Sequence, residues 1–151
     1  MGTLRHRFVR TGNKIGVWLH RVARGRLDSG GRAQVLMVTS PGRRTGIPRS
    51  TMVRFLEHDG GYLVWGSGSG SATEPDWFRN LRKAERARIE VGTRVVDVRP
   101  EVLAGAERDR VWQDVVLAEV PGVARYERKA GRTIPVAVLR PVEVIDPGSA
   151  A

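Results

Sequence analysis

Cysteine is absent from the 151 residues, and histidine occurs only three times. Disulfides, zinc–thiolate sites and thiol nucleophiles are therefore excluded, and no metal ligands are expected from so few histidines. The sequence also lacks a secretory apolar segment near its N-terminus and any apolar run close to the roughly 20 residues that span a bilayer. These absences predict a cytoplasmic protein that folds without a metal or a disulfide.

The sequence motifs of the common hydrolases are missing as well. There is no Gly-x-Ser-x-Gly, no His-Glu-x-x-His, and the carboxylates are scattered. The glycines of 42–46 and 66–70 lack the spacing of a P-loop or a dinucleotide-binding fingerprint. An enzyme with so few candidate catalytic groups would depend on a cofactor for its chemistry.

Positive charge is abundant. Lysine and arginine number 26 against 16 acidic residues, a formal net charge of +10, and only three of the 26 are lysines. Such an excess is typical of proteins that bind nucleic acid, an anionic membrane surface or a polyanionic small ligand. Charge alone does not decide among these partners.

Short apolar segments separated by glycine turns predict a mainly β (α+β) fold. His58-Asp59-Gly60-Gly61 and Gly92-Thr93 are hairpin signals, so neighbouring strands are expected to pair antiparallel. About six antiparallel strands with flanking helices in one small domain favour a barrel. The expected strands are 35–39, 51–56, 62–65, 88–91, 94–98 and 134–139.

Three helices are expected around these strands. Asn13 is a candidate cap for a basic amphipathic helix over 13–23, and a longer helix is expected over 107–119. A short helix should begin near Pro75 with Thr73 as its cap. The glycine–serine run 66–71 has the composition of a flexible linker but lies between a strand and a helix. The chain is expected to comprise an N-terminal helix (1–26), a barrel domain (27–146) and a flexible tail (147–151).

The segment Thr39-Ser40-Pro41-Gly42-Arg43-Arg44-Thr45-Gly46-Ile47-Pro48-Arg49-Ser50 follows the first strand. Its glycines and prolines shape the backbone, and its three arginines can each bind a phosphate or carboxylate through two parallel hydrogen bonds. An anionic ligand is one interpretation; a surface turn with solvated guanidinium groups is the other.

This arginine loop and three later blocks together resemble the deazaflavin-dependent nitroreductase family, whose members are split β-barrel flavin/deazaflavin oxidoreductases. The similarity covers roughly residues 33 to 141 in the expected order. The four blocks are Gly42-Arg43-Arg44-Thr45-Gly46-Ile47-Pro48-Arg49, Gly66-Ser67-Gly68-Ser69-Gly70, Pro75-Asp76-Trp77-Phe78-Arg79-Asn80-Leu81, and Tyr126 with Arg132-Thr133-Ile134-Pro135.

The resemblance implies a split β-barrel that binds coenzyme F420, a deazaflavin whose tail carries a phosphodiester and several glutamates. It implies that the tail is gripped by Arg43, Arg44, Thr45 and Arg49. The next strand would line the cofactor with Ser50, Thr51, Met52, Val53 and Arg54. The deazaflavin ring would be approached by Trp65, Gly66, Ser67 and Gly68, and the cofactor wall would be completed by Asp76, Trp77, Phe78, Arg79 and Asn80.

The implied reaction is hydride transfer from reduced deazaflavin to a small electron-poor substrate, such as a quinone, an enone or a nitro compound. Well-known relatives carry three tyrosines over the substrate; the matching substrate positions here are Val120, Val123 and Tyr126. Gly68 replaces a lysine that relatives often carry. Tyr126 and Ser67 are the residues expected to touch or orient the substrate, and weak nitroreduction is expected.

Other interpretations stay open. A split barrel could hold FMN or haem in place of F420, and a basic chain could bind nucleic acid, although its aromatic content is only 6% and no recognition motif is visible. The N-terminal helix could contact an anionic membrane. Split barrels commonly pair, so a homodimer is also considered.

Overall fold

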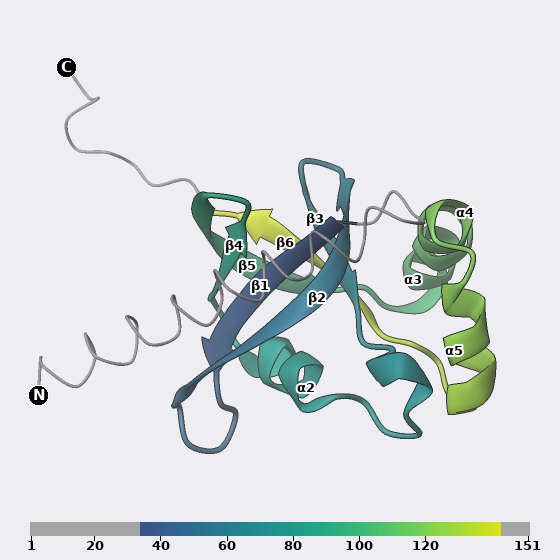
Figure 1. Ribbon diagram of the computed structural model, residues 1–151, viewed down its shortest axis with the longest axis horizontal. Helices are drawn as coiled ribbons and strands as arrows, with labels where there is room; N and C mark the ends of the chain where they lie inside the picture. The colour runs from purple at the N-terminus through teal and green to yellow at the C-terminus, as the bar shows by residue number, and fades with distance from the viewer. Residues whose placement is uncertain (1–33, 143–151) are drawn as a thin grey trace, which may run out of the picture.

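The computed structural model describes residues 34–142 (Figure 1). The predicted helix over 13–23 and the tail over 147–151 lie outside this range.

Six antiparallel strands close into a barrel, which confirms the predicted fold class. Their spatial order is β1-β2-β3-β6-β5-β4, and β4 pairs back onto β1. Closure is incomplete along β2, because β3 pairs only with its last three residues, 56–58. Among the described residues, 48–55 of β2 is paired on one side only, with β1. The strands are β1 (Gln34–Pro41), β2 (Pro48–His58), β3 (Gly61–Trp65), β4 (Ala87–Val91), β5 (Arg94–Val102) and β6 (Val136–Pro141).

The predicted hairpin turn between β2 and β3 is confirmed. Asp59 and Gly60 have φ values of 51° and 73°, the pair of positive φ angles that a tight hairpin turn requires. β1 and β2 remain paired as far as Pro41 opposite Pro48, so the arginine loop is confined to 42–47 at the end of this ribbon.

Two hydrophobic cores lie on opposite sides of the sheet. The barrel interior is filled by residues such as Leu36, Ile89 and Leu139, and helix α2 (Asp76–Lys83) adds Phe78 and Leu81 to it. This packing holds α2 against the barrel, next to the arginine loop (Figure 1).

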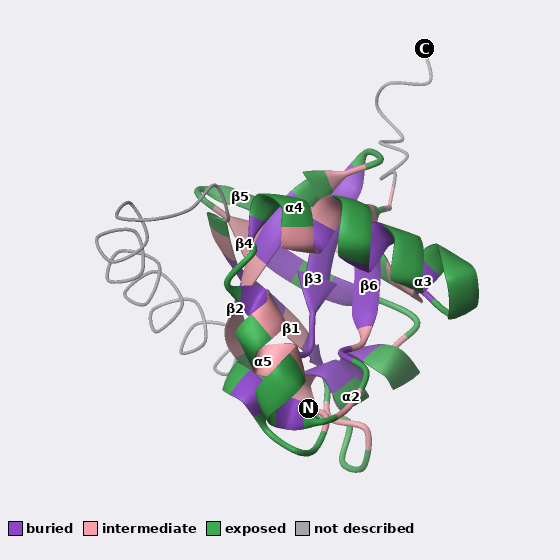
Figure 2. Ribbon diagram, turned by 90° about the vertical axis from the view of Figure 1, so that its right-hand side faces the viewer, coloured by how far each residue is buried: buried purple, intermediate pink, exposed green. Residues whose placement is uncertain are grey.

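The second core lies between the outer face of β3 and β6 and the remaining helices (Figure 2). These are α3 (Gly105–Val111), the π-helical turn η2 (Trp112–Val116), α4 (Leu117–Glu119) and α5 (Val123–Ala130). The helix predicted over 107–119 therefore begins two residues earlier and is interrupted by a π-helical turn.

Helix α5 was not predicted. Four of its eight residues are charged, which obscures its apolar side. Val123, Tyr126 and Ala130 fall at i, i+3 and i+7 and face the outer core. Gly131, with φ of 63°, ends the helix in the left-handed conformation that glycine adopts readily.

The predicted cap of α2 is wrong. Pro75 precedes the first helical residue, and no side chain caps the helix. The carbonyl of Pro75 accepts hydrogen bonds from the N–H groups of Phe78 and Arg79 at 3.0 and 3.1 Å. The carbonyl of Thr73 accepts a bond from the Ser71 hydroxyl, so Thr73 belongs to the preceding loop, residues 66–73, which we call the glycine-rich loop.

Candidate functional site

The arginine loop is closed on itself by backbone hydrogen bonds. The N–H of Gly42 donates to the carbonyl of Ile47, and the N–H of Gly46 donates to the carbonyl of Gly42, both at 2.8 Å. Gly46 has φ of 72°. The Thr45 hydroxyl accepts a bond from the Ile47 N–H at 3.2 Å, so its oxygen is engaged within the loop. The loop is therefore a shaped structure, as the sequence predicted.

Arg43 ties this loop to helix α2. Its backbone N–H and its Nη1 donate to Oδ1 of Asn80 at 3.1 and 2.9 Å. Its Nη2 pairs with Oδ1 of Asp76 at 3.0 Å. Asn80 is buried, and only 17% of the Arg43 side chain is exposed. Arg43 was expected to grip a ligand; in the structure its guanidinium is hydrogen-bonded to Asn80 and paired with Asp76, so it connects the loop to α2.

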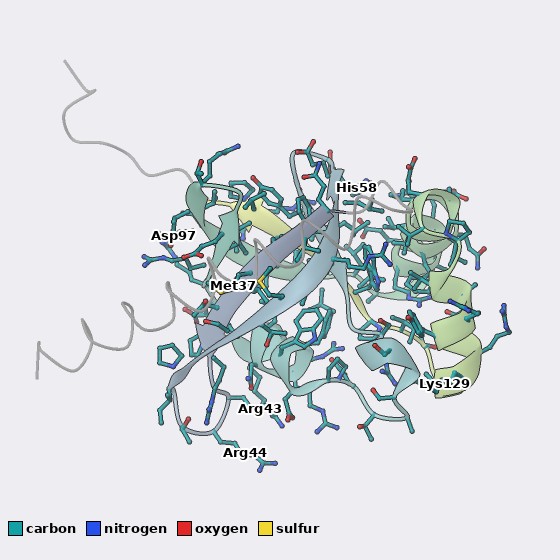
Figure 3. The ribbon with its side chains drawn as sticks, viewed as in Figure 1. Met37, Arg43, Arg44, His58, Asp97 and Lys129 are labelled. Carbon is teal, nitrogen blue, oxygen red and sulfur yellow. The ribbon has the colours of Figure 1, made fainter. Side chains whose placement is uncertain are left out.

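Arg44 and Arg49 present their charge differently. Both residues are exposed, and neither forms an ion pair with another residue of the described segment. Figure 3 shows Arg44 pointing away from the barrel at the tip of the loop, while Arg43 lies beside α2. Two guanidinium groups, Arg44 on the loop and Arg49 at the start of β2, are thus available to an anion.

The residues of β2 predicted to line the ligand divide between two faces, because side chains alternate along a strand. Val53 lies in the barrel interior, and Thr51 pairs with the interior residue Val38. The alternate residues Ser50, Met52 and Arg54 belong to the outer face. The Ser50 hydroxyl bonds to that of Thr39 at 2.7 Å. The Nε of Arg54 is buried and has no hydrogen-bond partner in the described part of the chain.

The glycine-rich loop is ordered by hydrogen bonds and is not the loose linker that its composition suggests. It contains a 3₁₀ turn, η1 (Gly68–Gly70), and begins at Gly66, whose N–H donates to the carbonyl of Pro135 at 2.9 Å. A Cβ on Gly66 would lie 3.0 Å from both the Phe78 ring and the Pro135 ring. Trp65, predicted to approach the ligand, is buried in the outer core.

Three further expected contacts come from α2. Phe78 is completely buried in the barrel interior and packs edge to face against Trp77, with ring centroids 5.4 Å apart. Trp77 is half-buried and Arg79 is exposed. Of the two aromatic residues, Phe78 belongs to the core, and only Trp77 has exposed surface that a ligand could contact.

The three positions predicted to contact substrate differ in burial. Val120 and Val123 are 6% and 1% exposed and belong to the outer core. Tyr126 is half-buried and packs against that core. Ser67 is half-buried as well. Among these residues, Tyr126 and Ser67 retain surface that a substrate can reach.

The fold brings the expected site residues together in two groups. Arg43 joins the arginine loop to α2, and α5 packs on the glycine-rich loop (Figure 1). A Cβ on Gly70 would lie only 2.8 Å from the side chain of Lys129 on α5. Helix α5, which carries Tyr126, therefore lies against the loop that carries Ser67.

One residue of this arrangement was assigned no role from the sequence. Arg132 follows α5, and its guanidinium donates to carbonyls of the glycine-rich loop. The sequence signal was its place near Ile134-Pro135 in the last of the four blocks, but nothing in that block indicates what the side chain binds.

Other features of the described residues lie away from this surface. A hollow of about 370 Å³ is lined by the β2–β3 hairpin, including His58 and Tyr62. Figure 3 shows His58 at the opposite end of the barrel from Arg43 and Arg44. Within residues 34–142 no group of three histidine or acidic side chains is arranged to hold a metal. None of the helices in this range is long and apolar enough to cross a membrane.

Comparison with known proteins gives consistent relatives. Residues 14–141 match the family model described as F420H(2)-dependent quinone reductase. The F420H(2)-dependent quinone reductase Rv1261c of Mycobacterium tuberculosis (strain H37Rv) is 28% identical over 106 residues, covering 69% of this chain and 71% of the relative. Rv3178 of the same strain, named provisionally for the same activity, is 30% identical over 118 residues, covering 77% and 98%.

Two solved structures share the fold. One, described as an F420-H2 dependent reductase (FDR-A), has a TM-score of 0.61 and 26% identity, covering 70% of this chain and 93% of its own. Another, described as a domain-swapped dimer, has a TM-score of 0.62 and 23% identity, covering 90% and 99%. The second match bears on the fold alone.

Proposed function

Because the chain belongs to the F420H(2)-dependent quinone reductase family, we propose that it transfers a hydride from reduced F420 to a quinone bound beside the glycine-rich loop. The chain is an oxidoreductase that uses coenzyme F420. The observation that carries the proposed site is the pair of exposed guanidinium groups of Arg44, on the hydrogen-bonded arginine loop, and Arg49, at the start of β2.

The residues of the structure fit this cofactor. Its tail carries a phosphodiester and several glutamates, and Arg44 and Arg49 offer unpaired forks for such groups. The buried Nε of Arg54 lacks a partner among the described residues, although a buried donor is normally hydrogen-bonded. A cofactor lying along the outer face of β2 would supply an acceptor there.

The structure favours different roles for the expected cofactor residues. Arg44 and Arg49 bind the tail, and Ser50, Met52 and Arg54 form the floor on β2. Arg43 with Asn80 and Asp76 fixes the loop against α2, which positions the charged residues. Ser67 and Gly68 approach the ring, and Trp77 and Arg79 complete the wall from α2.

When bound, F420 supplies the hydride, and the chain supplies binding and orientation. Tyr126 and Ser67 offer hydroxyl groups that can donate hydrogen bonds to a quinone oxygen. No residue of the site needs to act as a nucleophile. Val120 and Val123 are buried in the outer core, which leaves Tyr126 and Ser67 as the residues that can meet a quinone. Enones and nitro compounds are proposed as poorer acceptors.

Titration of the purified protein with F420 tests this proposal. We expect the cofactor's fluorescence to change with micromolar or tighter affinity, and reduced F420 to be oxidised when a soluble quinone is added. FMN, haem and a generic DNA duplex are the comparison ligands. Absence of F420 binding, or tighter binding of FMN or haem, would contradict the proposal, and DNA binding with a steep salt dependence but no F420 binding would favour the nucleic-acid alternative.

Contact with an anionic membrane is proposed as an addition, because residues 1–33 contain eight basic residues and one acidic residue. A membrane surface would bring the enzyme to lipid-soluble quinones. We expect co-sedimentation with vesicles containing phosphatidylglycerol and not with neutral vesicles, and loss of sedimentation when residues 1–26 are deleted. Sedimentation unchanged by the deletion would contradict the proposal.

A homodimer is proposed on sequence grounds and is checked by light scattering.

A further inference from the structure

Arg132 donates hydrogen bonds to several backbone carbonyls of the glycine-rich loop. Its Nη2 donates to the carbonyl oxygens of Gly66 and Thr73, both at 3.1 Å, and to that of Ser67 at 3.4 Å. Its Nε donates to the carbonyl oxygen of Ser71 at 3.0 Å. One side chain thus contacts four carbonyls along eight residues of the loop.

The loop needs such an external support. Gly68, Ser69 and Gly70 have φ values of 53°, 54° and 86°, so three successive residues are left-handed, and Ser69 carries a side chain that disfavours this conformation. Within the loop only two backbone bonds hold the turn, from Gly70 N–H to Ser67 and from Ser71 N–H to Gly68. Such a short turn does not keep an unfavourable backbone in place unaided.

Packing around the loop limits where it can move. Gly66 is wedged between Phe78 and Pro135, and Gly70 lies against Lys129. With the carbonyls turned to Arg132, the N–H groups of Ser67, Gly68 and Ser69 form no hydrogen bond within the described residues. The loop therefore keeps a row of free donors next to the half-buried Ser67 side chain.

We propose that Arg132 is a positioning residue for the cofactor: it holds the glycine-rich loop so that its free N–H groups and Ser67 face the ring of bound F420. This inference rests on the proposed function. Arg132 acts through the loop and is not itself assigned a contact with F420.

An arginine suits this position because its planar fork can serve several acceptors at once. Lysine has the same charge, but it places that charge on a single ammonium group at the end of a flexible chain. It therefore cannot bind the four carbonyl oxygens at once. The Nη1 of Arg132 is buried and has no partner among the described residues, so the side chain retains its place through Nε and Nη2. Arg132→Lys is therefore a conservative test that keeps charge and removes the fork.

The test compares Arg132→Lys and Arg132→Ala with the unchanged protein in two measurements. Hydrogen exchange within residues 66–73, without cofactor, is read at the hydrogen-bonded amides of Gly66, Gly70 and Ser71. It is expected to speed up by about tenfold in both variants, because the loop opens more often. The dissociation constant and KM for reduced F420 are expected to rise about tenfold, with kcat falling less. Guanidinium added at low millimolar concentration should partly restore the Arg132→Ala variant.

Arg140→Lys is the matched control. Arg140 pairs with Glu101 at 2.5 Å and with Asp59 at 3.6 Å, at the opposite end of β3 from the glycine-rich loop. The hydrogen bond that Arg140 donates to the Glu101 carboxylate raises the pKa of Arg140. This variant also removes a fork, and we expect it to leave exchange of 66–73 and F420 affinity unchanged.

The outcomes separate the two proposals. If the unchanged protein does not bind F420, the proposed function fails, whereas exchange of 66–73 still decides whether Arg132 holds the loop. If the protein binds F420 and Arg132→Lys alters neither exchange nor affinity, the positioning role is wrong. An equal loss of affinity in Arg140→Lys would also overturn it, because the effect would then be general to the fold.

Discussion

Replacement of Arg44 and Arg49 together by alanine is expected to weaken F420 binding about a hundredfold without lowering the melting temperature. Each charge-assisted hydrogen bond contributes about 1.5–3 kcal/mol, reduced where water screens it, and about 2.7 kcal/mol corresponds to a factor of one hundred. Both side chains are exposed and make no ion pair in the described segment, so the fold does not depend on them. Fluorescence titration and thermal unfolding measure the two effects.

Arg43→Ala provides the contrast. It removes the bond from Nη1 to Asn80 and the pair with Asp76, so we expect it to lower the melting temperature as well as the F420 affinity. Arg44→Lys with Arg49→Lys keeps the charge and loses the fork, and should fall between the unchanged protein and the double alanine variant. Unaltered affinity in the double alanine variant would show that the tail binds elsewhere.

Replacement of Phe78 by alanine is expected to lower the free energy of unfolding by about 3–5 kcal/mol, the usual cost of emptying a large aromatic site in a core. Phe78 is completely buried between α2 and the barrel, and its ring touches both Trp77 and the position where a Cβ on Gly66 would lie. Loss of the Phe78 ring should loosen the packing of α2 on the barrel, and α2 carries Asn80, to which Arg43 is hydrogen-bonded. Urea denaturation followed by far-UV circular dichroism measures the change in the free energy of unfolding.

Trp77→Ala is the neighbouring control. Because Trp77 is only half-buried, its removal is expected to cost about 1 kcal/mol of stability but to weaken F420 binding, as a residue of the cofactor wall would. A larger stability loss for Trp77→Ala than for Phe78→Ala would contradict the assignment of Phe78 to the core and Trp77 to the wall.

The strands and hairpins were predictable because their determinants are local. The apolar run from Val35 forms β1, and Asp59-Gly60 adopts the positive φ angles that a tight turn needs. Helix α5 escaped prediction because its apolar side is carried by few residues, and those become a recognisable stripe only against the core formed by β3 and β6. The cap of α2 was wrong because Thr73 is drawn into the glycine-rich loop by Ser71.

The roles of the arginines could not be assigned from the sequence. Arg43 and Arg44 are adjacent and chemically identical, yet one is tied to Asn80 and the other is exposed at the loop tip. Arg132 is 66 residues away from Gly66, whose carbonyl it binds. The sequence predicted that the positive charge of the arginine loop binds an anion. The tertiary structure decided which of these charges remain available for a ligand.

The sequence by itself predicted a six-stranded antiparallel barrel and a shaped arginine loop, because turn chemistry and strand periodicity are properties of neighbouring residues. F420 was implied by the resemblance of its motifs to a known family. Only the closed barrel decided which side chains became supports and which became binding groups. A guanidinium binds whatever acceptor lies within hydrogen-bond reach, and that distance is set by the packing of α2 and α5 on the sheet, far from the residue itself in the chain.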